Sequence, residues 1–309
     1  MTSDRARPFA SLALLLIAPM ILGALLAPQI YNLLVWLGQS VDLGPHLSNP
    51  KFKRVLSRCV LIVAVLLFYP AVRLSGVTSF RDLGWSRDPR RWRTIAAWYI
   101  AGAALMAAIY TGCDLAGALY FKPRSPEIGR ALAELGALFV GSLFIGIFEE
   151  TFFRGYVFGV FRPRLNFWAA AVAASAIFAV VHLARPAAPE GLDPTHWLAG
   201  IRMLPHITDG VEARYLAPSM ANLFLMGMLF CILYVRAGSI YPAIGLHGGW
   251  VWAMGIGTYL FDRNGDRLGA WLGPSETIAM TWLGTAVVVV CIVAALMIPI
   301  RKAESVGAA

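Results

Sequence analysis

Long runs without charged side chains dominate this chain and limit what it can fold into. Each is about 20 residues or longer, enough for a helix to cross the hydrocarbon core of a bilayer. The six runs are 8–41, 94–113, 165–184, 215–235, 237–261 and 277–300. Two further apolar segments, roughly 55–75 and 128–158, are shorter or interrupted by charge. The pattern therefore predicts about eight transmembrane helices.

The composition and the chemistry of the bilayer indicate the same class of protein. Of the 309 residues, 59% are hydrophobic and 14% are charged, whereas a soluble domain carries roughly a quarter charged residues. In lipid, only helices and closed barrels satisfy the backbone hydrogen-bonding groups. No solenoid repeat or low-complexity linker divides the sequence. We predict an all-α, polytopic integral membrane protein with a single membrane domain over residues 1–309.

The first apolar run follows Arg5 and Arg7, as the core of a signal peptide would. It is too long for that and has no clean cleavage site, so we expect a retained first span. Pro19 and Pro28 are expected to bend this span or to end it early.

The net charge of +9 does not indicate nucleic acid as a partner, because the basic residues are scattered through loops. That distribution fits contacts with the anionic headgroups of a lipid bilayer. The densest cluster, "RDLGWSRDPRRWR" (81–93), is typical of a cytoplasmic loop with interfacial aromatic residues. With eight spans, both termini are then cytoplasmic. Arginine greatly outnumbers lysine, which points to a bacterial chain in the cell (inner) membrane.

Charged residues interrupt one apolar segment at "FEETFFRGYVF" (148–158). An ionisable group at the centre of a span costs about 2.5–3.5 kcal/mol, so such groups are functional candidates. Glu150 and Arg154 are four residues apart, which favours an ion pair on one helix face. Glu149 lies about 100° around the helix from Glu150. We expect Glu149 to face a cavity, where a poised carboxylate suits a general base.

Further polar residues fall in separate predicted helices. His182 ends the fifth in "IFAVVH", with Phe178 one turn earlier on the same face. His247 lies in the seventh, in "AIGLHGGWVW", and Asn222 lies in the sixth. Each of these residues could instead have a purely structural role as an interhelical hydrogen bonder. The Glu–Arg pair could likewise serve only to hold two helices together. Their occurrence on separate helices favours a shared site.

Three of these segments resemble the motifs of one family. "EETFFR" matches EExxxR, "FAVVH" matches FxxxH, and "HGGWV" is similar to the start of HxxxN. In this order, on three predicted helices, they resemble the CAAX-protease and bacteriocin-processing family of intramembrane glutamic endopeptidases. That family includes the type II CAAX prenyl proteases. The resemblance covers roughly residues 128–260, which would contain the catalytic helices.

The resemblance implies a role for each matching residue. Glu149 would be the catalytic carboxylate, and His182 would help it to hold and deprotonate water. Glu150 and Arg154 would form a supporting pair, with Phe178 beside them, and His247 would stabilise the oxyanion. The implied substrate is a peptide or a membrane-anchored protein, and neither a cofactor nor a metal is implied.

The sequence departs from the family at the last motif. Val251 stands where the family has asparagine, so an expected amide donor is missing. Trp250 carries an indole N–H three residues after His247, and Asn222 lies on the preceding predicted span. These two residues are the candidate replacement donors for the oxyanion.

Two alternatives remain open. Glu149, His182 and His247 could instead be three ligands of a catalytic zinc ion, although no HExxH motif occurs. The loss of the asparagine favours a different class, a non-catalytic membrane scaffold or immunity protein of the same family.

The longest polar connection, 185–216, begins three residues after His182. Its proline and glycine content excludes one long helix, while "THWLAGIRML" predicts a short amphipathic piece. Loops of this length are usually functional or disordered. We expect a lid or a substrate-docking surface that is not needed for the fold.

Overall fold

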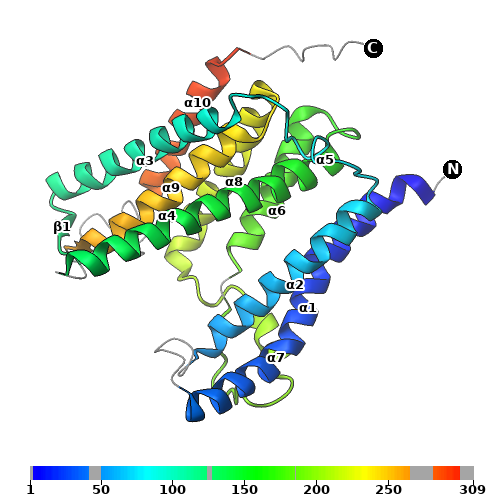
Figure 1. Cartoon of the computed structure of the whole chain (residues 1–309), viewed down its shortest axis with the longest axis vertical. Coiled ribbons are helices and arrows are strands. Elements are labelled where there is room, and N and C mark those ends of the chain that lie inside the picture. Colours follow the sequence, from blue (N-terminus) through cyan, green and yellow to red (C-terminus); the bar gives the residue numbers. More distant parts are fainter. Residues whose placement is uncertain (1–2, 42–49, 124–126, 185, 265–280, 300–309) are drawn as a thin grey trace. The chain divides into compact units, whose positions relative to one another are not determined.

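The computed structural model describes residues 3–41, 50–123, 127–184, 186–264 and 281–299, and it is mostly helical (Figure 1). Each of the eight predicted apolar segments corresponds to a helix. These are α1 (Ser3–Ser40), α2 (Phe52–Leu74), α3 (Arg91–Leu115), α4 (Ile128–Glu150), α6 (Phe167–His182), α8 (Ala213–Ala237), α9 (Tyr241–Leu260) and α10 (Trp282–Met297).

Five helical stretches among the described residues are long and apolar enough to cross a membrane. They are Arg7–Gln39, Phe52–Leu74, Arg91–Leu115, Ala131–Phe161 and Ala213–Ala237. α6 and α10 are also apolar but shorter, at 16 residues each. The prediction of an all-α polytopic membrane protein is therefore confirmed.

α1 runs through Pro8, Pro19 and Pro28 without ending. Of the two expected effects of Pro19 and Pro28, an early end of the first helix is wrong, and a bend stays a prediction. A proline removes one backbone hydrogen bond and crowds the preceding turn, but a helix of this apolar composition gains nothing by unfolding in lipid, where exposed backbone groups find no water.

The chain divides into two compact units. The first comprises Met1–Thr78 and His182–Glu212, and the second comprises Ser79–Val181 and Ala213–Ala309. Whether they act as the predicted single domain stays a prediction.

In the first unit, α1 and α2 pack against each other, and the short helix α7 (Ala199–Met203) packs on α1. α7 is followed by the 3-10 turn η2 (Leu204–His206). Met203 is fully buried with Ala24 and Leu56. A Cβ atom at Gly200 would lie 2.0 Å from the carbonyl oxygen of Ala24. Part of the long connection is thus core, which argues against the expectation that it is dispensable for the fold.

In the second unit, α9 lies between α3 and α4 (Figure 1). Glycines permit this approach because they leave room for a neighbouring backbone. A Cβ at Gly249 would lie 2.1 Å from the carbonyl oxygen of Tyr99 on α3. A Cβ at Gly146 of α4 would lie 2.8 Å from that of Ile244 on α9. α9 is therefore held by backbone contacts on two sides.

A two-stranded antiparallel sheet, which was not predicted from the sequence, joins the ends of α3 and α9. β1 (Leu119–Phe121) pairs with β2 (Phe261–Arg263). Next to the pair, Lys122 Nζ lies 3.0 Å from Asp262 Oδ2. The hydrogen bond from Lys122 lowers the pKa of the Asp262 carboxyl from its usual value.

The fourth span is one helical rod with a change of winding in its middle. α4 ends at Glu150, the π-helical segment η1 (Thr151–Val157) follows, and α5 (Phe158–Phe161) completes it. All seven residues of η1 are buried. π-helical turns are rare and occur frequently at functional sites. This segment, which was not predicted from the sequence, begins directly after the two glutamates.

Candidate functional site

A buried ion pair lies at the junction of α4 and η1. Arg154 Nη1 donates to Glu150 Oε1 over 3.0 Å, and both side chains are almost wholly inaccessible to solvent. This is the contact that the four-residue spacing favours. Burying a carboxylate or a guanidinium alone would cost several kcal/mol, so each requires the other in this position.

Aromatic rings from three elements surround the guanidinium group. The Arg154 Cζ atom lies 4.7 Å from the ring centroids of both Phe178 on α6 and Phe230 on α8. Phe153, its neighbour in η1, lies 5.8 Å away. A cation over an aromatic face is stabilised by the ring quadrupole, more strongly when water is excluded. Phe178 therefore supports the arginine directly.

His247 of α9 contacts the same carboxylate. Its Nδ1 atom lies 2.8 Å from Glu150 Oε1, across 97 positions of sequence. A carboxylate oxygen accepts hydrogen bonds, so in this contact Nδ1 is the donor. The imidazole is also stacked on Phe230, with centroids 5.1 Å apart and planes 20° apart. The ring is thus held at its edge and on its face.

The other ring nitrogen of His247 faces the first glutamate. Nε2 lies 3.8 Å from Glu149 Oε2, which is longer than a hydrogen bond and short enough for one small polar group to contact both atoms. The Glu149 side chain is 23% exposed, whereas that of Glu150 is fully buried. Of the two adjacent carboxylates, Glu149 is the one that a reactant can reach.

The remaining predicted residue with a base-like side chain is His182. It is the last residue of α6 and is partly buried. It belongs to the first unit, while Glu149 and His247 belong to the second. Its role in holding water stays a prediction.

The two candidate donors for the missing asparagine are both buried. Trp250 is 2% exposed and Asn222 is 1% exposed. Within the described part of the chain, the indole Nε1 of Trp250 and both amide atoms of Asn222 have no hydrogen-bond partner. Buried polar groups normally have one, so both side chains retain capacity for a ligand. Val251 is partly buried on α9.

Two residues that touch this site were missed by the sequence analysis. Phe230 contacts both Arg154 and His247, and no pattern distinguishes it from the other apolar residues of its helix. Trp85 donates from Nε1 to Thr151 Oγ1 over 3.1 Å. The sequence shows that Trp85 lies in a basic loop with a second tryptophan. It does not show that Trp85 contacts Thr151, the residue after Glu150.

Over the described ranges, no group of three or more His, Cys, Asp or Glu side chains comes together as a candidate metal site. The zinc alternative therefore has no supporting cluster there, and metal removal tests it.

One comparison with known proteins gives a match. Residues 131–253 match the family model described as type II CAAX prenyl endopeptidase, Rce1-like. The matched region includes Glu149, Glu150, Arg154, His182 and His247. No curated protein and no solved structure matches the chain.

Proposed function

Since residues 131–253 match the family model of Rce1-like type II CAAX prenyl endopeptidases, we propose that this protein is a membrane-embedded endopeptidase in which Glu149 activates a water molecule. The observation that carries the proposal is the difference in contacts and exposure between the two glutamates. Glu150 Oε1 contacts both Arg154 and His247, and Glu149 is the more exposed carboxylate, beside His247 Nε2.

The chemistry follows from that arrangement. Glu149 takes a proton from water, and the hydroxide attacks the carbonyl carbon of the scissile peptide bond. When the imidazole carries a proton on Nε2 as well, this N–H is available to the oxyanion of the tetrahedral intermediate. Collapse of the intermediate breaks the C–N bond, and Glu149 returns its proton to the departing amine. No covalent enzyme intermediate forms.

Glu150 and Arg154 act as positioning residues in this scheme. The carboxylate of Glu150 fixes the His247 tautomer through Nδ1, which leaves Nε2 directed at Glu149. The same carboxylate stabilises the imidazolium when it forms. Arg154 forms the ion pair with Glu150, and the rings of Phe178 and Phe230 keep Arg154 in place. His182 is the proposed second ligand of the water, by its match to the family motif.

The proposed substrate is a peptide or a membrane-anchored protein. The bilayer location fits a protease whose substrate is itself held in the membrane. We propose the cell membrane of a bacterium as its location, with both termini cytoplasmic.

The experiment compares three cell lines that express the wild type, Glu149→Gln or Glu134→Gln. Glutamine keeps the shape of the side chain but accepts a proton poorly. Glu134 lies on α4 roughly 22 Å along the same helix and serves as the matched control. Quantitative proteomics of membrane and secreted fractions should show uncleaved precursors accumulating with Glu149→Gln alone. The same precursor pattern in wild-type and Glu149→Gln cells, at equal protein levels, would remove Glu149 as the base.

A non-catalytic scaffold is the second candidate, and Val251 in place of the asparagine favours it. Purified protein distinguishes the two, because a scaffold binds such a precursor without cleaving it.

A further inference from the structure

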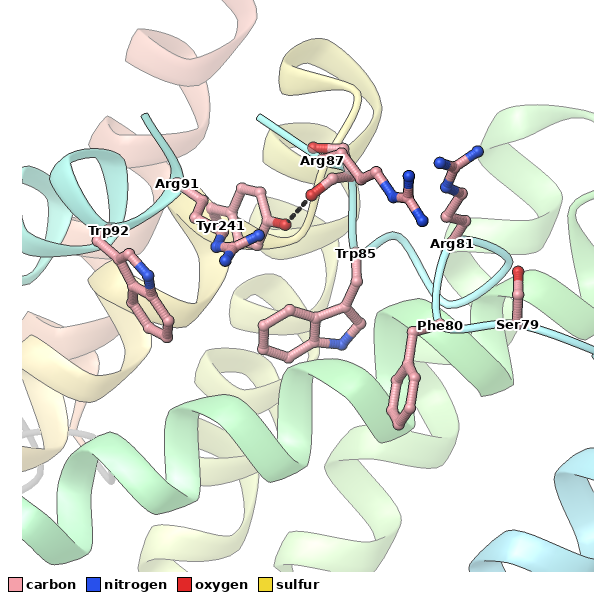
Figure 2. Close-up of a pocket in the computed structure, with 9 residues that line it drawn as sticks. Ser79, Phe80, Arg81, Trp85, Arg87, Arg91, Trp92 and Tyr241 are labelled. Atoms are coloured by element: carbon pink, nitrogen blue, oxygen red, sulfur yellow. Dashed lines mark hydrogen bonds between the residues drawn. The ribbon is translucent and has the colours of Figure 1, made fainter. Parts of the chain in front are cut away.

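The second unit contains a pocket of about 460 Å³ that is separate from the glutamates. It is built from the basic loop before α3 and the beginning of α9 (Figure 2). Three arginines, Arg81, Arg87 and Arg91, line it together with aromatic rings. The hydroxyl of Tyr241 donates to the carbonyl oxygen of Ser86, which ties α9 to the loop (Figure 2).

Arginine side chains give this pocket a positive charge. Within the described part of the chain, no carboxylate pairs with Arg81, Arg87 or Arg91, and all three are exposed. The neighbouring Asp82 and Asp88 accept hydrogen bonds from backbone N–H groups of the loop. Guanidinium groups match phosphate oxygens in bidentate geometry. The pocket is therefore complementary to an anion that presents several oxygens.

The pocket also lies where a membrane surface is expected. Arg91 is the first residue of α3, a candidate span, and Tyr241 is the first residue of α9. Both helices point their positive N-terminal ends to this region. Phe80 and Trp92 on its rim are 74% and 59% exposed. Large exposed aromatic rings at the end of a span belong at the level of the lipid headgroups.

We propose that this pocket binds the phosphate of an anionic phospholipid headgroup. The arginines would hold the phosphate oxygens, and the exposed rings would contact the glycerol and the upper acyl chains. A free phosphate ion would use only the first of these contacts.

The loop that lines the pocket also contacts the helical segment next to the proposed active site. Trp85, which lines it, donates to Thr151, the residue after Glu150. On the same loop, the carbonyl oxygen of Leu83 lies 2.6 Å from the position of a Cβ at Gly155. The loop backbone thus rests on η1. A bound headgroup would hold the loop against the segment that carries Arg154.

The test measures lipid binding, so its result does not depend on any peptidase activity. Full-length protein in detergent is titrated with dioctanoyl-phosphatidylglycerol or dioctanoyl-phosphatidylcholine, and retained lipid is counted by native mass spectrometry. Arg87→Gln/Arg91→Gln removes two pocket arginines. Arg90→Gln/Arg93→Gln is the matched control, because it removes the same charge from the same exposed segment outside the pocket.

We expect one phosphatidylglycerol to bind in preference to phosphatidylcholine. The pocket variant should bind it about tenfold more weakly or worse, because losing one charge-assisted hydrogen bond lowers the affinity by at least that factor. The control should change it little. Equal weakening by both variants, or equal retention of the two lipids, would overturn the proposal. Full displacement by millimolar inorganic phosphate would assign the site to a free anion instead. If the double variant does not fold, Arg81→Gln gives the same comparison.

Discussion

His247 and Glu150 are joined by a 2.8 Å hydrogen bond between Nδ1 and a fully buried carboxylate oxygen. The bond connects the middle of α9 to the end of α4, and the same carboxylate oxygen accepts from Arg154. One buried atom therefore contacts both the guanidinium group and the imidazole. Glu150 is thereby taken up by two protein contacts, while the adjacent Glu149 is more exposed.

Replacing Glu150 by glutamine should destabilise the protein and also lower its activity. The substitution leaves the Arg154 charge buried without a partner, which typically costs about 3–5 kcal/mol. Thermal unfolding in detergent measures the loss. Glu150→Gln/Arg154→Met should recover part of it, because the second change removes the stranded charge. An unchanged melting temperature in the single variant would contradict the structural role assigned to the pair.

Gly249→Ala should disrupt the packing of α9 on α3. The added Cβ would lie 2.1 Å from the Tyr99 carbonyl oxygen, and backbone cannot move aside as a side chain can. Gly141→Ala is the control, since nothing lies within 4 Å of a Cβ at that position of α4. We expect a lower melting temperature and lower expression for Gly249→Ala only. Comparable values for the two variants would mean that α3 and α9 are less tightly apposed.

The missing asparagine gives a prediction about Trp250 and Asn222. If either supplies the oxyanion donor, Trp250→Phe or Asn222→Leu should lower turnover by about 10²–10³. Trp250→Phe loses no hydrogen bond within the described residues, so any loss of stability should come from the smaller ring alone. Kinetics and thermal unfolding of the same preparations separate the two effects.

Val251→Asn completes that comparison. It should raise activity or leave it unchanged in an active enzyme. If the wild type is inactive, the two donor variants have no effect, and Val251→Asn alone creates activity, the natural protein is a non-catalytic relative.

Removal of metal ions should leave peptidase activity intact. The proposed reaction uses a carboxylate and two imidazoles as its acid–base groups, and it needs no Lewis acid. Prolonged incubation with phenanthroline, followed by an activity assay and elemental analysis, measures this. Activity that disappears and returns with zinc would favour the metallopeptidase alternative.

Local spacing was enough to predict part of this arrangement. The apolar run lengths predict the helices because the bilayer thickness sets them. The Glu150–Arg154 contact follows from one turn of helix. Contacts that depend on how separate helices pack have no such local pattern. The bond from His247 to Glu150, the stacking on Phe230 and the contact of Trp85 with Thr151 belong to this class.

The short elements were harder to predict for a different reason. The strands β1 and β2 have three residues each and depend on their pairing with each other. The burial of Met203 against α1 shows that a polar, proline-containing connection can hold core residues. The average composition of such a segment does not reveal that one of its residues is buried.

The π-helical winding of η1 has a consequence for changes in chain length. Each of its i→i+5 hydrogen bonds closes a loop one residue longer than the i→i+4 bond of the flanking α-helix. A deletion of one residue within Thr151–Val157 would let the rod return to ordinary α-helical winding. The tighter winding would take up the missing residue, so the residues beyond the deletion would keep nearly their orientation relative to Glu149. This stretch should therefore tolerate the loss of one residue better than the α-helical segments on either side of it.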